Sequence, residues 1–162
     1  MEICPGGAEF IPAMARLHAA SFEEAWGEAA LAEILAMPGV FMLWATLRRA
    51  KADNLSGSSD AGRQSLLSGF VITRMAADEA EILTVAVDIH ERGQGLGRKL
   101  MEAAAARARA FGAVSLFLEV ADDNLPAIAL YERLGFITVG MRPGYYKRGP
   151  ARIAARAMRL GL

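Results

Sequence analysis

Cysteine is almost absent from this chain of 162 residues, in which Cys4 is the only one. A single cysteine forms no disulfide within the chain and fits a reducing compartment such as the cytosol. We interpret Cys4, close to the amino terminus, as an inert thiol rather than a nucleophile. No group of histidines and cysteines has the spacing of a metal site, so we expect no metal cofactor.

An excess of one charge is also lacking. Lys and Arg together number 18, as do Asp and Glu, so the formal net charge is zero. Proteins that bind the phosphate backbone of nucleic acids usually carry a strong basic excess, so nucleic acid is not an expected partner. Two local basic runs, Arg48-Arg49 and Arg142 to Arg152, are interpreted as solvated faces.

Long apolar runs and a leader pattern are missing as well. The apolar segment Gly39–Leu47 is much shorter than the ~20 residues that a membrane-spanning helix needs. The amino terminus lacks a charged region followed by a continuous apolar run. We therefore expect a soluble, cytoplasmic protein with no membrane contact. The length suits one domain, and we expect residues 1–162 to form it.

The apolar residues that are present predict a mixture of helices and strands. Helical spacing is found in Glu9–Ser21, Glu28–Met37, Arg98–Phe111 and Asn124–Leu134. Short apolar segments predict strands over Val40–Leu47, Ser65–Met75, Glu79–Val87, Val114–Val120, Phe136–Met141 and Ile153–Leu160. The polar segment Ala50–Gln64 is interpreted as a loop that joins two strands of a hairpin.

The order of these elements predicts the fold class. Two helices precede three antiparallel strands. A strand–loop–helix–strand crossover then pairs its two strands in parallel, and a helix and two further strands follow. We expect a single α/β domain with a mixed central sheet and helices on both of its faces.

The loop before the third helix alternates glycine with other residues. It reads Arg92-Gly93-Gln94-Gly95-Leu96-Gly97 and is followed by Arg98 and Lys99. Glycine lets a ligand approach bare backbone, and the first N–H groups and positive dipole end of a helix attract phosphate oxygens. The loop therefore predicts a site for a pyrophosphate or a similar group. The alternative is a glycine-rich turn that only starts a helix.

Two common phosphate-binding loops do not fit this segment. A nucleotide-binding P-loop would need Gly-Lys followed by Ser or Thr, which is absent. Glu119 lies about twenty residues beyond the loop, where a dinucleotide fold would place its ribose-binding acid. However, the dinucleotide fingerprint is G-x-G-x-x-G, and here the third glycine comes one residue early. The loop also follows its strand only after Asp88–Glu91, so we do not favour a dinucleotide.

The pattern Arg92-x-x-Gly95-x-Gly97 resembles the acyl-CoA pyrophosphate loop of the GNAT acetyltransferases, Arg/Gln-x-x-Gly-x-Gly/Ala. Within that family the chain is most similar to the bacterial ribosomal-protein-alanine N-acetyltransferases. The similar segments are Phe22-x-x-x-Trp26, Leu118–Val120, Asn124, Ala127–Phe136, Arg142 and Tyr145-Tyr146. Two features depart from the subfamily: Ala121 stands where Arg is frequent, and the Ala50–Gln64 loop looks long.

The resemblance implies transfer of an acetyl group from acetyl-CoA to a primary amine, with a protein N-terminus, such as that of a ribosomal protein beginning with alanine, as the acceptor. Glu119 would be the general base, directly or through a water, and Tyr131 the general acid that protonates the leaving thiolate. The alternatives are a salt-bridged strand carboxylate for Glu119 and a packing residue for Tyr131. An α-amine with a pKa near ~8 keeps more neutral amine at pH 7 than a lysine near ~10.4, and so suits a carboxylate base.

The resemblance also implies how acetyl-CoA is held. Backbone groups of Val85, Ala86 and Val87 would pair with the pantetheine amides like an added strand, and one of their N–H groups would hold the thioester carbonyl. The side chain of Asn124 would bond the pantetheine or cap its helix. The full cofactor-binding set is Val85, Ala86, Val87, Arg92, Gly93, Gln94, Gly95, Leu96, Gly97, Arg98 and Asn124.

Several assignments stay open at the level of the sequence. The residues Glu81, Arg142, Tyr145 and Tyr146 either shape the acceptor pocket or lie on the surface. His18 and His90 are interpreted as a helix-face and a loop histidine, not as catalytic groups. Two other functions compete: a GNAT enzyme that acetylates lysine or a small amine, and a non-catalytic acyl-CoA-binding module. Such a module would need neither Glu119 nor Tyr131.

Overall fold

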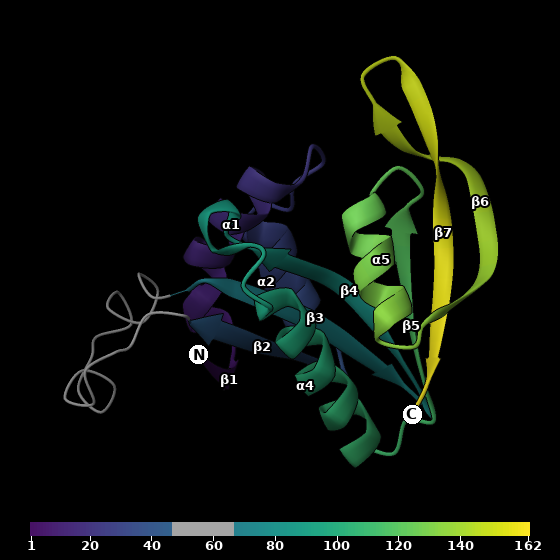
Figure 1. Cartoon of the computed structure of the whole chain (residues 1–162). Coiled ribbons are helices and arrows are strands. Elements are labelled where there is room, and N and C mark those ends of the chain that lie inside the picture. The colour runs from purple at the N-terminus through teal and green to yellow at the C-terminus, as the bar shows by residue number, and fades with distance from the viewer. Residues whose placement is uncertain (47–66) are drawn as a thin grey trace.

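The computed structural model describes residues 1–46 and 67–162, which form a seven-stranded sheet with helices packed against it (Figure 1). The strands are β1 Glu2–Gly6, β2 Val40–Thr46, β3 Gly69–Ala76, β4 Glu79–Val87, β5 Ser115–Ala121, β6 Ile137–Arg148 and β7 Ala151–Gly161. The helices are α1 Ile11–Ser21, α2 Glu28–Ala36, α4 Leu96–Ala110 and α5 Leu125–Arg133. The predicted loop Ala50–Gln64 and the Arg48-Arg49 pair lie outside the described residues.

The sheet is mixed, as the order of elements predicts. Its strand order is β1-β2-β3-β4-β5-β7-β6. Strands β1 to β4 pair antiparallel, β4 and β5 pair in parallel, and β7 pairs antiparallel with both β5 and β6. The α/β class and the parallel crossover through α4 are therefore confirmed. Among the described residues no helix combines the length and the apolar character needed to cross a membrane.

Two strands and one helix differ clearly from the sequence-based prediction. Strand β1 was not predicted, because Pro5 and Gly6 are poor strand formers; as an edge strand, β1 tolerates its proline. Strand β6 continues to Arg148, well beyond Met141, although its pairing with β7 is irregular between Arg142 and Tyr146. Helix α4 begins at Leu96, so Leu96 and Gly97 belong to the helix and not to the preceding loop.

Each face of the sheet buries its own core, because successive side chains of a strand point to opposite faces. On β3, Val71 packs into the core shared with α4 and α5, whereas Phe70 and Ile72 pack into the core shared with α1 and α2. The helices therefore cover both faces, as predicted. This arrangement fixes the position of α4 and α5 relative to the carboxyl ends of β4 and β5.

The parallel strands β4 and β5 pair only where they begin. Glu79 to Glu81 pair with Ser115 to Phe117, after which the two strands diverge (Figure 1). Strand β4 also carries a register shift opposite Ile72 and Thr73, and such bulges bend a strand. The carboxyl ends of β4 and β5 therefore lie apart in the sheet. We call this diverging part of the sheet the β4–β5 wedge.

His18 ties α1 to the sheet and to the segment before α2. Its Nδ1 accepts a hydrogen bond from the Trp26 backbone N–H at 3.0 Å, so the neutral ring carries its proton on Nε2. That Nε2 lies 3.3 Å from the Thr84 hydroxyl of β4, and the ring stacks on Trp26. Burial lowers the pKa of His18 from 6.5 to about 4. His18 is therefore a packed, neutral residue at neutral pH, which agrees with its non-catalytic interpretation.

The lowered pKa of His18 predicts that the protein loses stability in mild acid. The unfolded chain takes up the imidazole proton near pH 6.5 and the folded chain only near pH 4, so the contribution is complete above pH 6.5. We expect up to about 3 kcal/mol of unfolding free energy to be lost as the pH falls from 7 to 4. Urea unfolding of the wild type and His18→Gln at both pH values measures this. An equally steep fall in the variant would contradict it.

Candidate active site

The glycine loop forms an open cradle at the start of α4. Gly93 and Gly95 have positive φ angles of 76° and 81°, and no other atom lies within 4 Å of where their Cβ atoms would stand. Gly95 is the residue that caps α4. The N–H groups of Leu96, Gly97 and Arg98 form the first turn and have no carbonyl one turn earlier to accept from them. The exposed glycine backbone and the positive end of the α4 dipole thus lie at the same place on the surface. This combination suits a pyrophosphate.

Two arginines flank the cradle. Arg92 donates from Nε to the Val87 carbonyl at 3.0 Å, and its Nη2 lies 3.5 Å from the Ser21 hydroxyl of α1. Arg98 pairs with Glu102 one turn further along α4, at 2.7 Å. Arg92 therefore fastens the loop to the end of β4, while both guanidinium groups stay exposed beside the glycines.

The left-handed backbone at Gly95 predicts a specific loss of cofactor affinity in Gly95→Ala. A Cβ there costs about 1–2 kcal/mol of backbone strain and also projects into the cradle. We expect the KM for acetyl-CoA to rise about tenfold or more. The matched control is Gly112→Ala, at the other end of α4, with φ of 96° and equally open space. The control should lose similar stability with an unchanged KM, and equal KM values in the two variants would contradict the assignment.

Strand β4 has a free edge inside the wedge. Val85, Ala86 and Val87 pair with β3 on one side, and no strand of the described residues pairs with them on the other. An edge of this kind accepts an extended partner through main-chain hydrogen bonds. The Val87 carbonyl is already bonded to Arg92. The predicted pantetheine-binding residues therefore lie at an unpaired strand edge, which the short segment Asp88–Glu91 joins to the glycine loop.

Glu119 lies on β5, which forms the other side of the wedge. Strand alternation places it on the opposite face from the buried Leu118 and Val120. Its side chain is 24% exposed and forms an ion pair with Arg142 of β6, with 2.9 Å between Oε1 and Nη2. The salt-bridged carboxylate weighed from the sequence is thus what the structure shows. Its role as a general base stays a prediction.

Tyr131 lies on α5 and is only 7% exposed. Its ring packs against Phe136, with 5.8 Å between ring centroids. Burial raises the pKa of Tyr131 to about 12, and the nearby Tyr146 phenol adds to the rise. The phenol therefore holds its proton throughout the neutral range, as a general acid requires.

Tyr146 is the residue that sequence analysis underrated. It is half-buried on β6, and its pKa is raised by burial, by the charge of Glu119 and by Tyr145, with partial opposition from Arg148 and Arg142. It therefore interacts electrostatically with both Glu119 and Tyr131. Its neighbour Tyr145 is 53% exposed and stands perpendicular to it, at 5.1 Å. The adjacent tyrosines were the available signal in the sequence. Only the path of β6 brings Tyr146 within electrostatic reach of Glu119 and Tyr131.

The sequence profile of the Acetyltransferase (GNAT) family matches residues 11–136, which include the glycine loop, Glu119 and Tyr131. The chain belongs to the GNAT acetyltransferase family. Membership accounts for the combination of a diverging β4–β5 pair with an anion cradle at the start of α4.

Individual members of the GNAT family are also similar to this chain. The [Ribosomal protein bS18]-alanine N-acetyltransferase of Escherichia coli K12 is 40% identical over 94 residues, which cover 58% of this chain and 64% of that protein. Less than two thirds of the relative's length is therefore matched. The crystal structure of the Escherichia coli ribosomal-protein-S18-alanine N-acetyltransferase superposes with a TM-score of 0.83 at 28% identity, covering 99% of this chain and 92% of that one.

A plant member of the fold is also similar. Arabidopsis thaliana NAA60, solved in complex with acetyl-CoA, has a TM-score of 0.80 at 17% identity, covering 99% of both chains. At this identity the likeness concerns the fold alone. The GNAT-like mixed sheet with helices on both faces, expected from the sequence, is thereby confirmed.

The remaining residues that the sequence singled out lie elsewhere in the structure. Asn124 caps α5: its side-chain oxygen accepts from the Ala127 N–H at 3.3 Å, which is one of the two roles weighed for it. Glu81 pairs with Arg74 at 2.7 Å, where β4 and β5 are still joined, and its role at the acceptor pocket stays open. His90 lies in a short turn after β4, where its backbone N–H donates a hydrogen bond to the Asp88 carboxylate.

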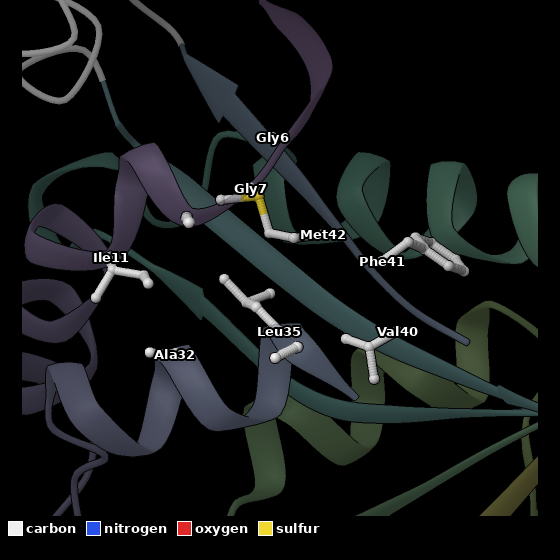
Figure 2. Close-up of a pocket in the computed structure, with 10 residues that line it drawn as sticks. Gly6, Gly7, Ile11, Ala32, Leu35, Val40, Phe41 and Met42 are labelled. Carbon is white, nitrogen blue, oxygen red and sulfur yellow. The ribbon is translucent and has the colours of Figure 1, made fainter. Parts of the chain in front are cut away.

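A separate pocket of about 230 Å³ lies between the start of α1, helix α2 and strand β2 (Figure 2). It is lined by apolar side chains, glycines and backbone, from Gly6, Gly7, Ala8, Ile11, Ala32, Leu35, Ala36, Val40, Phe41 and Met42. It supplies no side chain for acid–base chemistry, so we assign the candidate active site to the β4–β5 wedge and not to this pocket. In the part of the chain that the structure describes, no three His, Cys, Asp or Glu residues gather as a metal site.

Proposed function

We propose that this GNAT protein transfers the acetyl group of acetyl-CoA to the N-terminal α-amine of a protein. The observation that supports the proposal is the divergence of β5, which carries Glu119, from the unpaired edge of β4, together with the electrostatic effect of Tyr146 on Tyr131 and of Glu119 on Tyr146. The names of the Escherichia coli relatives support the finer proposal that the acceptor is the terminal alanine of a ribosomal protein.

Acetyl-CoA would bind along two features of the chain. The residues from Arg92 to Arg98 would hold the pyrophosphate, because they join exposed glycine backbone, a helix start and two guanidinium groups. Val85, Ala86 and Val87 would pair with the pantetheine as an added strand. This path would bring the thioester toward the β4–β5 wedge, where Tyr131 would have to reach the sulfur.

The chemical roles follow from what each side chain can donate or accept. Glu119 takes a proton from the acceptor amine, directly or through a water, as the nitrogen bonds to the thioester carbonyl carbon. A backbone N–H at the β4 edge holds the developing oxyanion. Tyr131 gives its proton to the sulfur as the carbon–sulfur bond breaks. The products are an amide and a free thiol, so a proton is lost at the amine and gained at the thiolate.

An α-amine fits a carboxylate base better than a lysine does. At pH 7 a useful fraction of an α-amine with a pKa near ~8 is already neutral, whereas a lysine near ~10.4 is almost entirely protonated. Glu119 then has only to remove the proton released as the bond forms. This favours a protein N-terminus over the lysine and small-amine alternatives.

Release of free CoA thiol from acetyl-CoA in the presence of short peptides tests the proposal. The panel contains an Ala-starting peptide without lysine, the same peptide with a blocked N-terminus, and a blocked peptide with an internal lysine. Release with the free alanine terminus alone is expected. Release with the internal lysine would instead assign the protein to side-chain acetylation. Acetyl-CoA binding without release from any peptide would leave a small amine as acceptor or a binding module.

A further inference from the structure

Arg107, in the last turn of α4, packs against two aromatic rings. Its guanidinium carbon lies 5.3 Å from the centre of the Phe41 ring of β2 and 5.1 Å from that of the Phe111 ring, which follows α4. The two rings meet edge to face, with 5.8 Å between their centroids. Contacts with aromatic rings orient a guanidinium and remove part of its hydration. Arg107 is therefore a positioned, partly buried cation.

This cation lacks an anionic partner among the described residues. Its Nε is buried and donates to no acceptor, and no carboxylate forms an ion pair with the guanidinium. Arg156, which is also partly buried, pairs with Asp122 at 2.6 Å. A charged donor taken out of water without a partner costs free energy, which an anion beside it would offset.

A cavity of about 470 Å³ opens beside the Arg107 guanidinium. It is lined by Gly39, Val40, Phe41, Met75, Ala77, Arg107 and Phe111. Among these described residues Arg107 alone carries a charge, and the other side chains are apolar. The backbone at one side is closely packed, because the Gly39 carbonyl accepts from the Met75 N–H at 2.8 Å. The cavity thus combines one positioned cation with an apolar wall.

The cavity lies at the opposite end of α4 from the glycine cradle (Figure 1). Arg107 is about 16 Å along the helix axis from Leu96, at the usual rise per residue. Strand β4 likewise begins at Glu79, near the cavity, and ends at Val87, beside the cradle. Acetyl-CoA along the β4 edge and the cradle would therefore leave this cavity free.

The charges and the lining define the class of ligand. A guanidinium offers parallel N–H donors that match a carboxylate or a phosphate. The carboxyl end of α4 carries a partial negative charge, which disfavours a doubly charged phosphate. An apolar wall suits a hydrocarbon or aromatic body. We propose that the cavity binds a small monocarboxylate with an apolar body, its carboxylate on Arg107 and its body against Val40 and Met75. This site is independent of the amine that the enzyme acetylates.

Titration with 3-phenylpropionate and with its uncharged counterpart, 3-phenylpropanamide, tests the inference. The protein is labelled with nitrogen-15 and saturated with CoA, which fills the cradle. NMR follows the amide signals of Gly39 and Ala77 and the Nε–H signal of Arg107. We expect the acid to shift these signals with a Kd of about 1 mM, and the amide to bind at least tenfold more weakly, because it cannot form the charged pair. Absence of shifts with the acid, or equal binding of the two compounds, would overturn the inference.

Arg107→Gln should weaken binding of the acid about tenfold and leave that of the amide unchanged. The matched control is Arg109→Gln, which removes the same charge from an exposed position on another side of α4. This control should bind the acid like the wild type, and both variants should keep the acetyl-CoA KM within about twofold. Unchanged binding in Arg107→Gln, or an equal loss in the two variants, would show that Arg107 only covers the rings and complements the α4 dipole.

Discussion

Glu119→Gln is expected to lower kcat by about 100- to 1,000-fold, with the affinity for acetyl-CoA changed by less than about twofold. The amide keeps the size and most of the contacts of the carboxylate but cannot accept the amine proton. Because the Glu119–Arg142 pair is partly exposed, its loss should cost no more than about 1 kcal/mol of unfolding free energy. Steady-state thiol release and calorimetric titration with acetyl-CoA measure the two effects separately.

Arg142→Gln is the control for Glu119→Gln, because it breaks the same ion pair and leaves the carboxylate in place. With a neutral acceptor peptide it should keep kcat within about threefold of the wild type. If both variants lose kcat equally, the ion pair rather than the carboxylate supports activity. If Glu119→Gln loses acetyl-CoA binding, Glu119 is a structural residue and the proposed base must lie elsewhere.

Tyr131→Phe is expected to lower kcat about 100-fold, with little change in the KM for either substrate. The phenylalanine ring keeps the packing against Phe136, so thermal stability should hardly change. Since burial raises the pKa of Tyr131 to about 12, the wild-type enzyme should not lose activity through this group below about pH 11. Measured kcat against pH, together with pre-steady-state thiol release, follows the step directly.

Two other results for Tyr131→Phe would contradict its role as the general acid. A lowered melting temperature with unchanged kcat would show that the buried ring contributes packing only. A tenfold rise in the acetyl-CoA KM with unchanged kcat would show that the hydroxyl holds the donor rather than protonating it. Either result would leave the leaving thiolate to be protonated by another group, with the half-buried Tyr146 as the nearest candidate.

Patterns within short segments of the sequence predicted much of the secondary structure. Helical spacing located α1, α2 and α5 to within a few residues, and the glycines before α4 predicted a cradle that the positive φ angles of Gly93 and Gly95 display. These features are encoded within a few neighbouring residues, so the sequence expresses them directly. Strand β1 and the second half of β6 were missed, because proline and glycine interrupt their apolar patterns. Pairing with the distant β2 holds β1 in place, and pairing with the adjacent β7 holds β6.

The sequence by itself determined the order of the elements after β1, the glycine loop before α4 and the membership of the GNAT family. Only the tertiary structure decided that β4 and β5 part after Glu81, that Glu119 pairs with Arg142, and that Tyr146 affects the pKa of Tyr131 while Glu119 affects that of Tyr146. The reason is physical: these contacts join different strands and helices, and their distances depend on strand register and bending. The irregular pairing of β6 with β7 between Arg142 and Tyr146 sets where these two side chains stand, and no local pattern of residues specifies that register.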